Sequence, residues 1–569
     1  MKKEKFLLIF LMSNFLFADK YYIRHENGKE VVIIDEHHQI ISNSLNKFLL
    51  SVKKGDILLF KRGEVFKEPI KIEDKEGIII KDYGLEKSKF PIIDTRYEIK
   101  NSSFEKIPFE NLKGDKSWNF LESEFRKNTL VLKSDLRDKI AKNFKDVQQN
   151  VYSIYRAKID LNNIDPNAMR VWVNGKEILK ALIFEEFKNL KDATWFYEKN
   201  GKYIYIFVLN KNFKLSKVKI NNRYLDSLSI ENSKDILISH LDIRGSKYAL
   251  SIRGSKNVKV KNSKIGLYSF SGIEIMKGFS GNYSQNISIE NNVIDSGFRA
   301  YYRYLSSRGA QDGIFLLSGV SNSEIVNNEI SNWGHSGINL YAPKGDLPVK
   351  NNKIYSNFIQ GNKVSYMHGV TVDGVNSIYN KIKFNIIRDI TARNQINGIG
   401  NIFSNNAVFN VKNSPVKIDQ GYFSAQGVEL QAYSKDNISK NNLIENNIFA
   451  KTDGACISLL SLNNDGMKEG NIFKDNILIN CGLKNNFIAL KVKDNGLNET
   501  IKKNYFINNI FKSKKSLIFY RGDILNINEF NEMDGKFSDK IKGNRVLKEE
   551  EIKRISPSPL LKPMKELNH

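Results

Sequence analysis

The phrase GVTV at residues 369–372 decides the fold, because variants of it recur through the second half of the chain. Each copy holds a small residue, an aliphatic residue, a variable residue and another apolar one. This alternation predicts a short strand with one buried face. The clear copies are ALSI at 249–252, GIEI at 272–275, GIFL at 313–316, GINL at 337–340 and GVEL at 427–430. Weaker copies are GIGN at 398–401, CISL at 456–459, FIAL at 487–490 and SLIF at 516–519.

The spacing of the copies indicates a stacked repeat. Gly369, Gly398, Gly427 and Cys456 follow one another at intervals of 29 residues. If each interval is one turn of a coil, side chains at equal offsets stack at the strand spacing of ~4.8 Å. We therefore predict a β-solenoid whose rungs bury their apolar faces together.

A recurring asparagine supports this prediction. Fifteen residues after the small residue, five rungs carry Asn328, Asn352, Asn413, Asn442 and Asn471. Two other rungs carry their asparagine one place away, at Asn286 and Asn385. Stacked amides can hydrogen-bond from rung to rung, so we predict an asparagine ladder along the coil.

With these repeats, the sequence resembles the right-handed parallel β-helix, or pectin-lyase-like, superfamily. The phrases KKGDILLFKRGEVF at 53–66 and PIID at 91–94 resemble the first rungs of secreted polysaccharide lyases and their epimerase relatives. SLNKFLLSVK at 44–53 has helical periodicity and is expected to cap the open end of the coil. The resemblance implies an all-β, right-handed parallel β-helix with an N-terminal helical cap.

The expected domain map follows from these signals. Lys2, Lys3 and Lys5 precede a short apolar run, which predicts a signal peptide over 1–18 and a periplasmic or secreted protein. The run is too short to span a membrane, and no later segment is apolar enough. We expect the cap and first rungs over 19–98, an inserted β-domain over 99–227, the main β-helix over 228–525 and a C-terminal cap and tail over 526–569.

The inserted region lacks the repeat. It holds strand-like VWVNGKEI at 171–178 and YIYIFVLN at 203–210 around Trp195 and Tyr197. Exposed aromatic rings could bind carbohydrate, but we favour an interpretation in which they pack the domain. Cys456 and Cys481 could oxidise in an exported chain. They do not share the repeat register, so a disulfide is not predicted.

The composition indicates the chemical class of the partner. The formal net charge is +25, which favours a polyanion. The lysines are scattered, so a Lys- and Asn-rich proteome would also explain this charge. Export argues against nucleic acid. We expect a monomer that binds an acidic polysaccharide, with no cofactor predicted and calcium left open, since no dense acidic cluster has calcium-ligand spacing.

One face of the coil carries the candidate chemistry. Residues between the two inward apolar positions point outward. This column reads Ser251, Glu274, Phe315, Asn339, Thr371, Gly400, Glu429 and Ser458. Before the small residue stand Asp312, His335 and His368 on three consecutive rungs, which places the two rings ~5–8 Å apart. Histidine is the side chain best suited to move protons near neutral pH.

A longer step between the rungs of Gly272 and Gly313 predicts a loop beside Asp312. Arginine can bind carboxylates there and tyrosine can stack on sugars. The loop holds Arg299, Tyr301, Tyr302, Arg303, Tyr304 and Arg308, and Tyr366 lies near the same edge. With Glu274, Phe315, Asn339, Asp373 and Glu429, the residues Arg299, Tyr301 and Tyr304 are the predicted substrate-binding set.

These parts match β-elimination on a uronic acid. Arg303 or Arg308 would neutralise the carboxylate, and His335 or His368 would remove the C5 proton. Tyr302 or Tyr366 would protonate the leaving O4. C5-epimerisation shares the first two steps, and the sequence does not separate the two outcomes.

Two other hypotheses stay open. Hydrolysis needs two carboxyl groups, and Glu274, Asp312, Asp373 and Glu429 are candidates. HGVTVDG at 368–374 distantly resembles the histidine–glycine strand of polygalacturonase-type hydrolases, but their paired aspartates on preceding rungs are absent. A non-catalytic glycan-binding β-helix explains the rungs and charge, but it leaves the convergence of histidines, Asp312 and the Arg/Tyr loop unexplained.

Overall fold

The structure is a computed structural model of the whole chain. It describes residues 19–34, 39–107, 151–159, 169–180, 192–198, 202–221, 225–297, 311–362, 367–413, 425–432, 438–461, 466–493, 501–512, 517–535 and 539–546.

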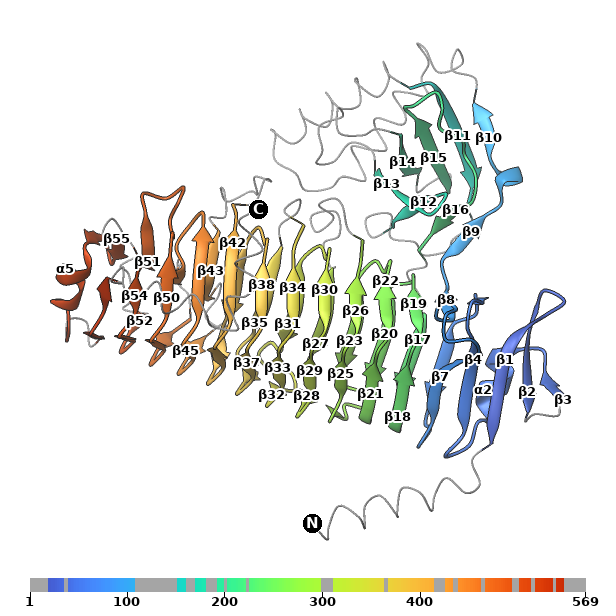
Figure 1. Cartoon of the computed structure of the whole chain (residues 1–569), viewed down its shortest axis with the longest axis horizontal. Coiled ribbons are helices and arrows are strands. Elements are labelled where there is room, and N and C mark those ends of the chain that lie inside the picture. The colour runs from blue at the N-terminus through green and yellow to red at the C-terminus, as the bar shows by residue number, and fades with distance from the viewer. Residues whose placement is uncertain are drawn as a thin grey trace, which may run out of the picture.

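The chain forms a parallel β-helix, as the repeat predicted. Its rungs stack along one long axis, and a smaller sheet projects from the coil (Figure 1). Each rung adds strands to three sheets, which we call A, B and C. From sheet C the chain passes through A, then B, and returns to C one rung further along.

Sheet C carries the repeated phrases. Its strands within the described residues are β6 (Ile70–Glu73), β17 (Leu228–Glu231), β20 (Tyr248–Arg253), β23 (Ser271–Met276), β27 (Asp312–Leu317), β31 (Ser336–Tyr341), β35 (His368–Asp373), β39 (Arg393–Ile396), β43 (Gln426–Ala432), β47 (Ile457–Ser461), β51 (Ile488–Lys493), β55 (Leu517–Tyr520) and β56 (Asp523–Leu525).

Sheet B precedes sheet C in each rung. Its described strands are β5 (Val65–Phe66), β8 (Ile92–Asp94), β19 (Asp242–Arg244), β22 (Lys264–Gly266), β26 (Val293–Asp295), β30 (Glu329–Ser331), β34 (Phe358–Gln360), β38 (Ile386–Arg388), β42 (Ala407–Val411), β46 (Ile448–Thr452), β50 (Ile477–Ile479), β54 (Ile510–Phe511) and β58 (Arg545–Val546).

Sheet A closes the rung and includes the N-terminal strands. It begins with β1 (Lys20–Glu26), β2 (Lys29–Ile34), β3 (Gln39–Ser42), β4 (Ile57–Lys61) and β7 (Ile79–Tyr83), and continues from β18 (Lys234–Ser239) and β21 (Lys256–Lys261) to β57 (Lys540–Lys542).

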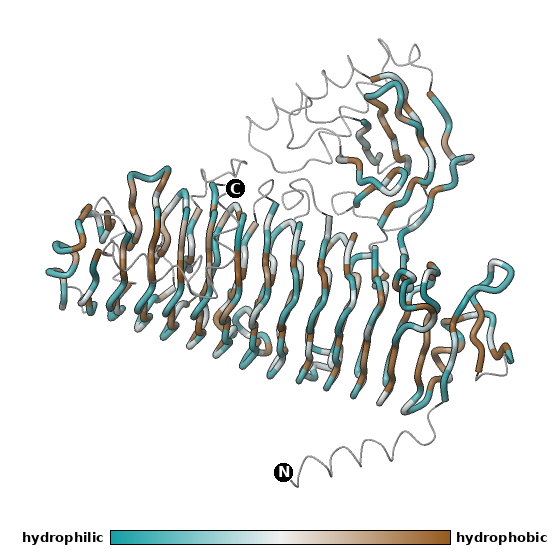
Figure 2. The backbone as a smooth tube through the Cα atoms, in the orientation of Figure 1, coloured by the Kyte–Doolittle hydropathy of each residue, from teal (hydrophilic) through white to brown (hydrophobic). Residues whose placement is uncertain are grey.

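The core lies inside the coil. Ile273, Ile314, Ile338 and Val370 occupy one register on successive strands of sheet C, and each is fully buried. Apolar and polar segments alternate along every rung (Figure 2). A rung alone would leave its inward residues in water, so neighbouring rungs stabilise each other by burying them.

Two asparagine ladders run along the coil where the sequence predicted one. In the first, each backbone N–H donates to the next side-chain carbonyl through Asn292, Asn328, Asn357, Asn385, Asn406, Asn447, Asn476, Asn509 and Asn544. The second passes through Asn352, Asn380, Asn401, Asn442, Asn471 and Asn504.

The predicted ladder mixed members of the two. Asn328 and Asn385 belong to the first ladder, and Asn352, Asn442 and Asn471 to the second. Asn286 instead lies exposed and donates to Asn257 Oδ1 at 3.0 Å. Asn413 bonds to Asp453 and Ala425 outside both ladders. The prediction was wrong for these two because turn lengths vary, so a fixed offset does not track one corner of the coil.

Short elements cover the coil ends. The predicted cap helix is α2 (Leu45–Ser51), which begins at Ser44 and buries Leu45, Phe48 and Leu49. At the other end, α5 (Ile527–Asn531) buries Ile527 and Phe530 and begins with a capping box at Asn526. Residues 1–18 and 547–569, which include the predicted signal peptide and tail, lie outside the described residues.

A separate sheet leaves the coil between β8 and β17. Its described strands are β9 (Tyr97–Ile99), β10 (Glu105–Ile107), β11 (Ser153–Lys158), β12 (Val171–Val173), β13 (Lys176–Lys180), β14 (Ala193–Glu198), β15 (Tyr203–Val208) and β16 (Val218–Ile220). Trp195 and Tyr197 are buried in its core, and Trp195 Nε1 donates to the Ile178 carbonyl at 3.1 Å. These two aromatics therefore pack the sheet, as we favoured.

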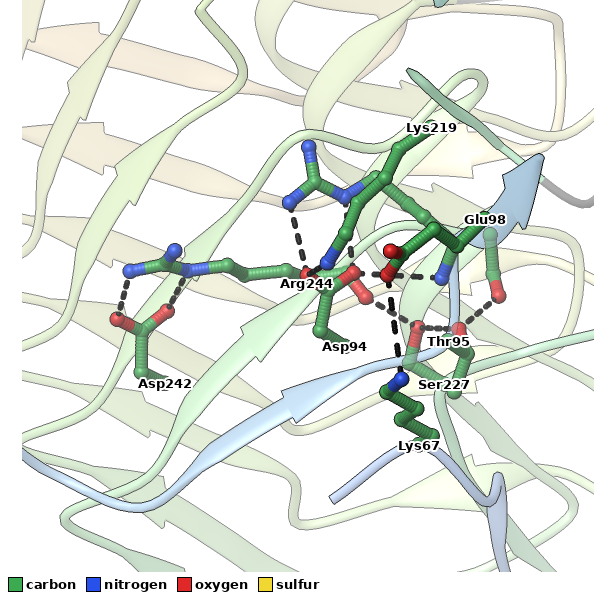
Figure 3. A network of polar contacts seen from close by, with 10 residues as sticks. Lys67, Asp94, Thr95, Glu98, Lys219, Ser227, Asp242 and Arg244 are labelled. Carbon is green, nitrogen blue, oxygen red and sulfur yellow. Dashed lines mark hydrogen bonds and ion pairs between the residues drawn. The ribbon is translucent and has the colours of Figure 1, made fainter. Parts of the chain in front are cut away.

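A buried polar network joins this sheet to the coil (Figure 3). Asp94, at the end of β8, accepts from Arg96 Nε and Nη2 at 2.8 Å each and from Lys219 Nζ of β16 at 2.9 Å. Burial alone would raise the pKa of Asp94, but the hydrogen bonds and charges of Arg96 and Lys219 outweigh it and hold this pKa well below its usual range.

A second contact fixes the sheet two rungs further along. Arg170 Nη1 donates to the carbonyls of Tyr268 at 2.7 Å and Ser296 at 2.8 Å. The guanidinium also pairs with Glu177 and lies 5.0 Å from the ring centroid of Trp172. The sheet is therefore held against the corner between sheets B and C.

The two cysteines are joined. Cys456 and Cys481 form a disulfide between the first residues of one rung and the end of the same rung, with a sequence separation of 25. The sequence left this bond unpredicted because the two residues occupy different register positions.

Candidate functional site

The two predicted histidines lie side by side at the corner where sheet B turns into sheet C. His335 stands in the turn between β30 and β31, and His368 is the first residue of β35. Ser336, next to His335, pairs directly with His368 across the two strands. The ring centroids are 5.2 Å apart at an interplanar angle of 70°, within the range expected for stacked rungs.

Asp312 orients one of the two rings. It is fully buried at the start of β27, and its Oδ1 lies 2.8 Å from His335 Nδ1. The Ser336 N–H also donates to Oδ1 at 2.9 Å, and Asn339 Nδ2 donates to Oδ2 at 2.9 Å. An ionised carboxylate only accepts hydrogen bonds, so it places the proton of His335 on Nδ1 and leaves Nε2 as the basic nitrogen.

The outward column of sheet C differs from the prediction at one rung. Thr371 pairs with Gln395, and Gln395 pairs with Glu429. Gly400, predicted for this position, lies beyond β40 (Gly398–Ile399) on sheet A. The two steps are therefore 24 and 34 residues, and the equal spacing of 29 had assigned GIGN to the wrong sheet.

This correction brings Arg393 to the site, a residue that the sequence analysis missed. It is the first residue of β39, one rung beyond His368, and it pairs with Glu429 of β43. Both side chains are buried. Burial raises the pKa of Glu429 although Arg393 and Lys491 act in the opposite direction. The phrase RNQI would have revealed Arg393 had the strand not been sought at a fixed interval.

Asp373 lies on the same face at the far end of β35. It accepts from Asn397 Nδ2 at 3.1 Å and from the Gly374 N–H at 2.9 Å. Burial raises the pKa of Asp373, while these hydrogen bonds and the charges of Arg393 and His335 lower it in part. A carboxyl group with a raised pKa suits proton donation near neutral pH.

Glu274 and Phe315 lie in the outward column, but N-terminal to the histidines. Burial raises the pKa of Glu274, which is paired with Arg253 at 3.3 Å. Arg253 also binds Asp226 at 2.8 Å and Glu231 at 3.0 Å, so this end of the face is a network of internal ion pairs. Phe315 is buried.

The structure therefore brings together His335, His368, Asp312, Asn339 and Asp373 of the predicted residues, with Glu429 two rungs beyond His368. Asn339 was predicted to bind substrate, yet it binds Asp312. The other predicted residues fall outside the described part of the chain: Arg299, Tyr301, Tyr302, Arg303, Tyr304 and Arg308 in the connection from β26 to β27, and Tyr366 in the connection from β34 to β35.

The described residues contain no group of three or more His, Cys, Asp or Glu side chains placed to hold a metal ion. Over the same residues, no helix is long and apolar enough to cross a membrane.

Comparisons with known proteins agree with the fold. A family model described as a right-handed β-helix region matches residues 206–416. A search of curated proteins found no match.

Solved structures give only a distant likeness. XylC in complex with xylose is 14% identical, with a TM-score of 0.42 over 88% of this chain and 80% of that one. The mannuronan C-5 epimerase AlgE6 A-module from Azotobacter vinelandii is 9% identical, with a TM-score of 0.41 over 87% and 91%. The catalytic unit of a GH87 α-1,3-glucanase from Streptomyces thermodiastaticus is 9% identical, with a TM-score of 0.36 over 70% and 88%. At these identities the likeness concerns the fold alone.

Proposed function

We propose that this chain, which forms a parallel β-helix, is an exported enzyme acting on an acidic polysaccharide. The proposed reaction is β-elimination or C5-epimerisation of a uronic acid unit. The observation that carries this proposal is the contact between the His335 and His368 rings, together with the hydrogen bond between Asp312 and His335.

His335 is the proposed base. Its Nε2 takes the C5 proton, because Asp312 fixes the proton on Nδ1 and stabilises the imidazolium that forms. His368 then lies next to a developing positive charge, so its neutral form is required when His335 accepts the proton.

Removal of the C5 proton leaves negative charge on the uronate carboxylate. A cation must stabilise that charge. The predicted Arg303 and Arg308 are the candidates for this role, because Arg393, one rung from His368, is held in a buried ion pair with Glu429. In elimination the C5–H electrons form the C4=C5 double bond, and the C4–O4 bond breaks.

The leaving O4 needs a proton. Asp373 is a further candidate donor, in addition to the predicted Tyr302 and Tyr366, since burial favours its protonated form. In epimerisation C4–O4 stays intact and a proton returns to the opposite face of C5. The same base serves both reactions, so the outcome depends on which group donates a proton first.

We rank hydrolysis below β-elimination and C5-epimerisation. Asp312 accepts three hydrogen bonds, Glu429 is paired with Arg393 and Glu274 with Arg253. A hydrolase needs one carboxyl group that donates a proton and a second that acts as base or nucleophile across the bond. The pairing of these three candidates works against either role.

The test is incubation of the purified protein with polygalacturonate, alginate and other acidic glycans. Elimination gives ultraviolet absorbance from the new double bond, and epimerisation in D2O places deuterium at C5 without that absorbance. New reducing ends without absorbance would indicate hydrolysis, and binding alone would indicate a non-catalytic glycan-binding protein. Either result overturns the proposal.

Variants locate the chemistry. His335→Ala and His368→Ala are expected to slow the reaction strongly while the protein stays folded. His240→Ala is the matched control, since His240 lies 3.5 Å from Asp82 in another His–Asp pair far from this face. Full activity in both His335→Ala and His368→Ala would remove the basis of the proposed mechanism.

A further inference from the structure

In sheet A, the rungs place one residue within the sheet and a second at the corner toward sheet B in the left-handed backbone region. Asparagine tolerates that region and is the commonest residue at both positions. Within the sheet the asparagines are Asn257, Asn286, Asn322, Asn351 and Asn441, and at the corner they are Asn262, Asn291, Asn327, Asn405, Asn446 and Asn508. The rung of β36 (Ser377–Ile378) and β37 (Lys381–Lys383) instead carries Tyr379 at φ 55° and Phe384 at φ 59°.

These two aromatic residues strain the backbone, because bulky side chains are disfavoured in this region. Burial does not offset the strain, since Tyr379 is 55% exposed and Phe384 is 49% exposed. A Cβ added at Gly400 on the next rung would lie 2.6 Å from Tyr379 Cδ1 and Cε1, so the Tyr379 ring rests on that glycine. Phe384 packs edge-on against Tyr355, with 6.4 Å between the ring centroids. The rung therefore displays two supported aromatic rings to the outside.

Apolar side chains continue this surface along the coil. Ile378 and Ile399 are register partners on the two rungs of Tyr379 and Gly400. In the neighbouring outward column, the partners on successive rungs are Ile402, Leu443, Ile472 and Tyr505. These four span three strand spacings, about 14 Å. All six side chains are partly exposed. We call these six residues, together with Tyr379 and Phe384, the apolar patch.

Lysines without matching acids lie beside the apolar patch. From β32 (Val349–Lys350) to β41 (Ile402–Ser404), the strands of sheet A contain no aspartate or glutamate. Their lysines are Lys350, Lys353, Lys381 and Lys383. Lys353 pairs with Glu324 of the preceding rung at 2.6 Å. Among the described residues, no carboxylate forms an ion pair with Lys381 or Lys383, which stand between the two aromatic residues on one rung. The surface is therefore both apolar and positively charged.

This combination favours an anionic lipid surface over other partners. Lysine attracts lipid phosphates as a point charge, while aromatic and aliphatic side chains enter the region between headgroups and acyl chains. A glycan could stack on the two rings, but it would gain little from the isoleucines and Leu443. In a symmetric dimer through this face, a second copy would place the same positive charges against each other, and like charges repel.

We propose that the apolar patch and its neighbouring lysines bind the protein to the surface of a membrane that contains anionic phospholipids. The apolar side chains enter the headgroup region, and the lysines contact the phosphates. Sheet A lies on the side of the coil away from the small sheet, which is held against the corner between sheets B and C (Figure 1). Bound through sheet A, the protein directs that corner, with His335 and His368, away from the membrane. The inference does not depend on the reaction proposed for the histidines.

The test is co-sedimentation of the purified protein with vesicles of phosphatidylglycerol and phosphatidylcholine, compared with vesicles of phosphatidylcholine alone. Binding is expected to the anionic vesicles and should weaken as salt is added. Lys381→Gln and Lys383→Gln should each weaken it about fivefold. Tyr379→Asn and Phe384→Asn should each weaken it about three- to tenfold, because less apolar surface enters the membrane.

The asparagine variants separate binding from folding. They introduce the residue that most often occupies these two backbone positions, so the melting temperature should not fall. The controls are Lys493→Gln, at the exposed end of β51 on sheet C, and Tyr152→Asn, 62% exposed beside the small sheet. Both controls should bind the anionic vesicles as the wild type does.

Three outcomes would overturn the proposal. The first is no binding to vesicles, or equal binding with and without phosphatidylglycerol. The second is unchanged vesicle binding in Tyr379→Asn and Phe384→Asn together with a lower melting temperature, which would assign the rings a structural role. The third is binding of a soluble polyuronate, weakened by the same two variants, without vesicle binding. Lys381→Gln and Lys383→Gln keep the test decisive if an asparagine variant does not fold. Vesicle binding without turnover of any glycan would support the membrane proposal and contradict the enzymatic one.

Discussion

Replacing one ladder asparagine should cost several kcal/mol, and Asn357→Ala is the sharpest test. The side-chain oxygen Asn357 Oδ1 accepts hydrogen bonds from Asn328 N and Nδ2 at 3.0 Å each. Its Nδ2 donates to the Ile325 carbonyl at 2.9 Å and to Asn385 Oδ1 at 3.0 Å. The substitution removes four hydrogen bonds and leaves their partners buried.

The magnitude follows from that count. At about 0.5–1.5 kcal/mol for each bond, the free energy of unfolding should fall by about 2–6 kcal/mol. This is a large share of the ~5–15 kcal/mol that stabilises a folded protein. The effect begins locally, because a rung contacts only its neighbours, but it interrupts a ladder that spans the coil.

Urea unfolding followed by circular dichroism, with thermal melting beside it, measures the loss. Asn528→Ala is the control, since Asn528 is exposed in α5 and lies outside both ladders. A loss below about 0.5 kcal/mol for Asn357→Ala, the range of surface substitutions, would refute the assignment of stability to the ladder.

Three further outcomes are expected. His335→Ala should lower the rate of proton removal about 10²- to 10⁴-fold, measured as double-bond formation or C5 deuteration, and retention of the full rate would contradict its role as base. The lowered pKa of Asp94 stabilises the fold above its unfolded value of about 3.9, and this contribution is lost as the pH falls through the lower folded pKa. Melting curves against pH should therefore show an acid-side loss that Asp94→Asn flattens, and identical curves would exclude this linkage. Cys456→Ser, which opens a disulfide spanning 25 residues, should lower the free energy of unfolding by about 3 kcal/mol, and dithiothreitol should give the same loss in the wild type but none in the variant.

Much of the fold could be predicted because the rungs of a β-solenoid repeat the same pattern of apolar residues along the sequence. The inward Ile and Val positions of the repeated phrase must alternate wherever they stack, so they are visible without coordinates. The two histidines were placed correctly for the same reason, since both stand beside well-marked strands. The cap helix over 44–53 was visible through its periodicity.

The errors arise where turns change length. Gln395 lies 24 residues after Thr371 and 34 before Glu429, so a search for equal steps passes over its strand and loses Arg393. The ladders were mixed because two corners of one rung both carry asparagine. Neither error is visible in a sequence read with one fixed offset, since connections of different length can add to the same total.

Burial of the outward column was also beyond sequence reasoning. Alternation assigns Gln395 and Glu429 to the outer face, and an outer position suggests exposure to water. In the folded chain their exposed fractions are 3% and 1%. This burial depends on three-dimensional packing, which the alternation of the sequence does not show.

The way the small sheet joins the coil has a consequence for how such proteins can change. Strand β6 pairs with β17 and β8 pairs with β19, so the rungs before and after the small sheet touch directly. The segment from 95 to 227 is therefore an insertion between two rungs that already pair with each other. Its loss would require a short turn between these rungs, and it would uncover the part of the coil core that contacts Val151, Ile154, Tyr205 and Phe207. The contacts of Asp94 and Arg170 help to hold the small sheet against the coil.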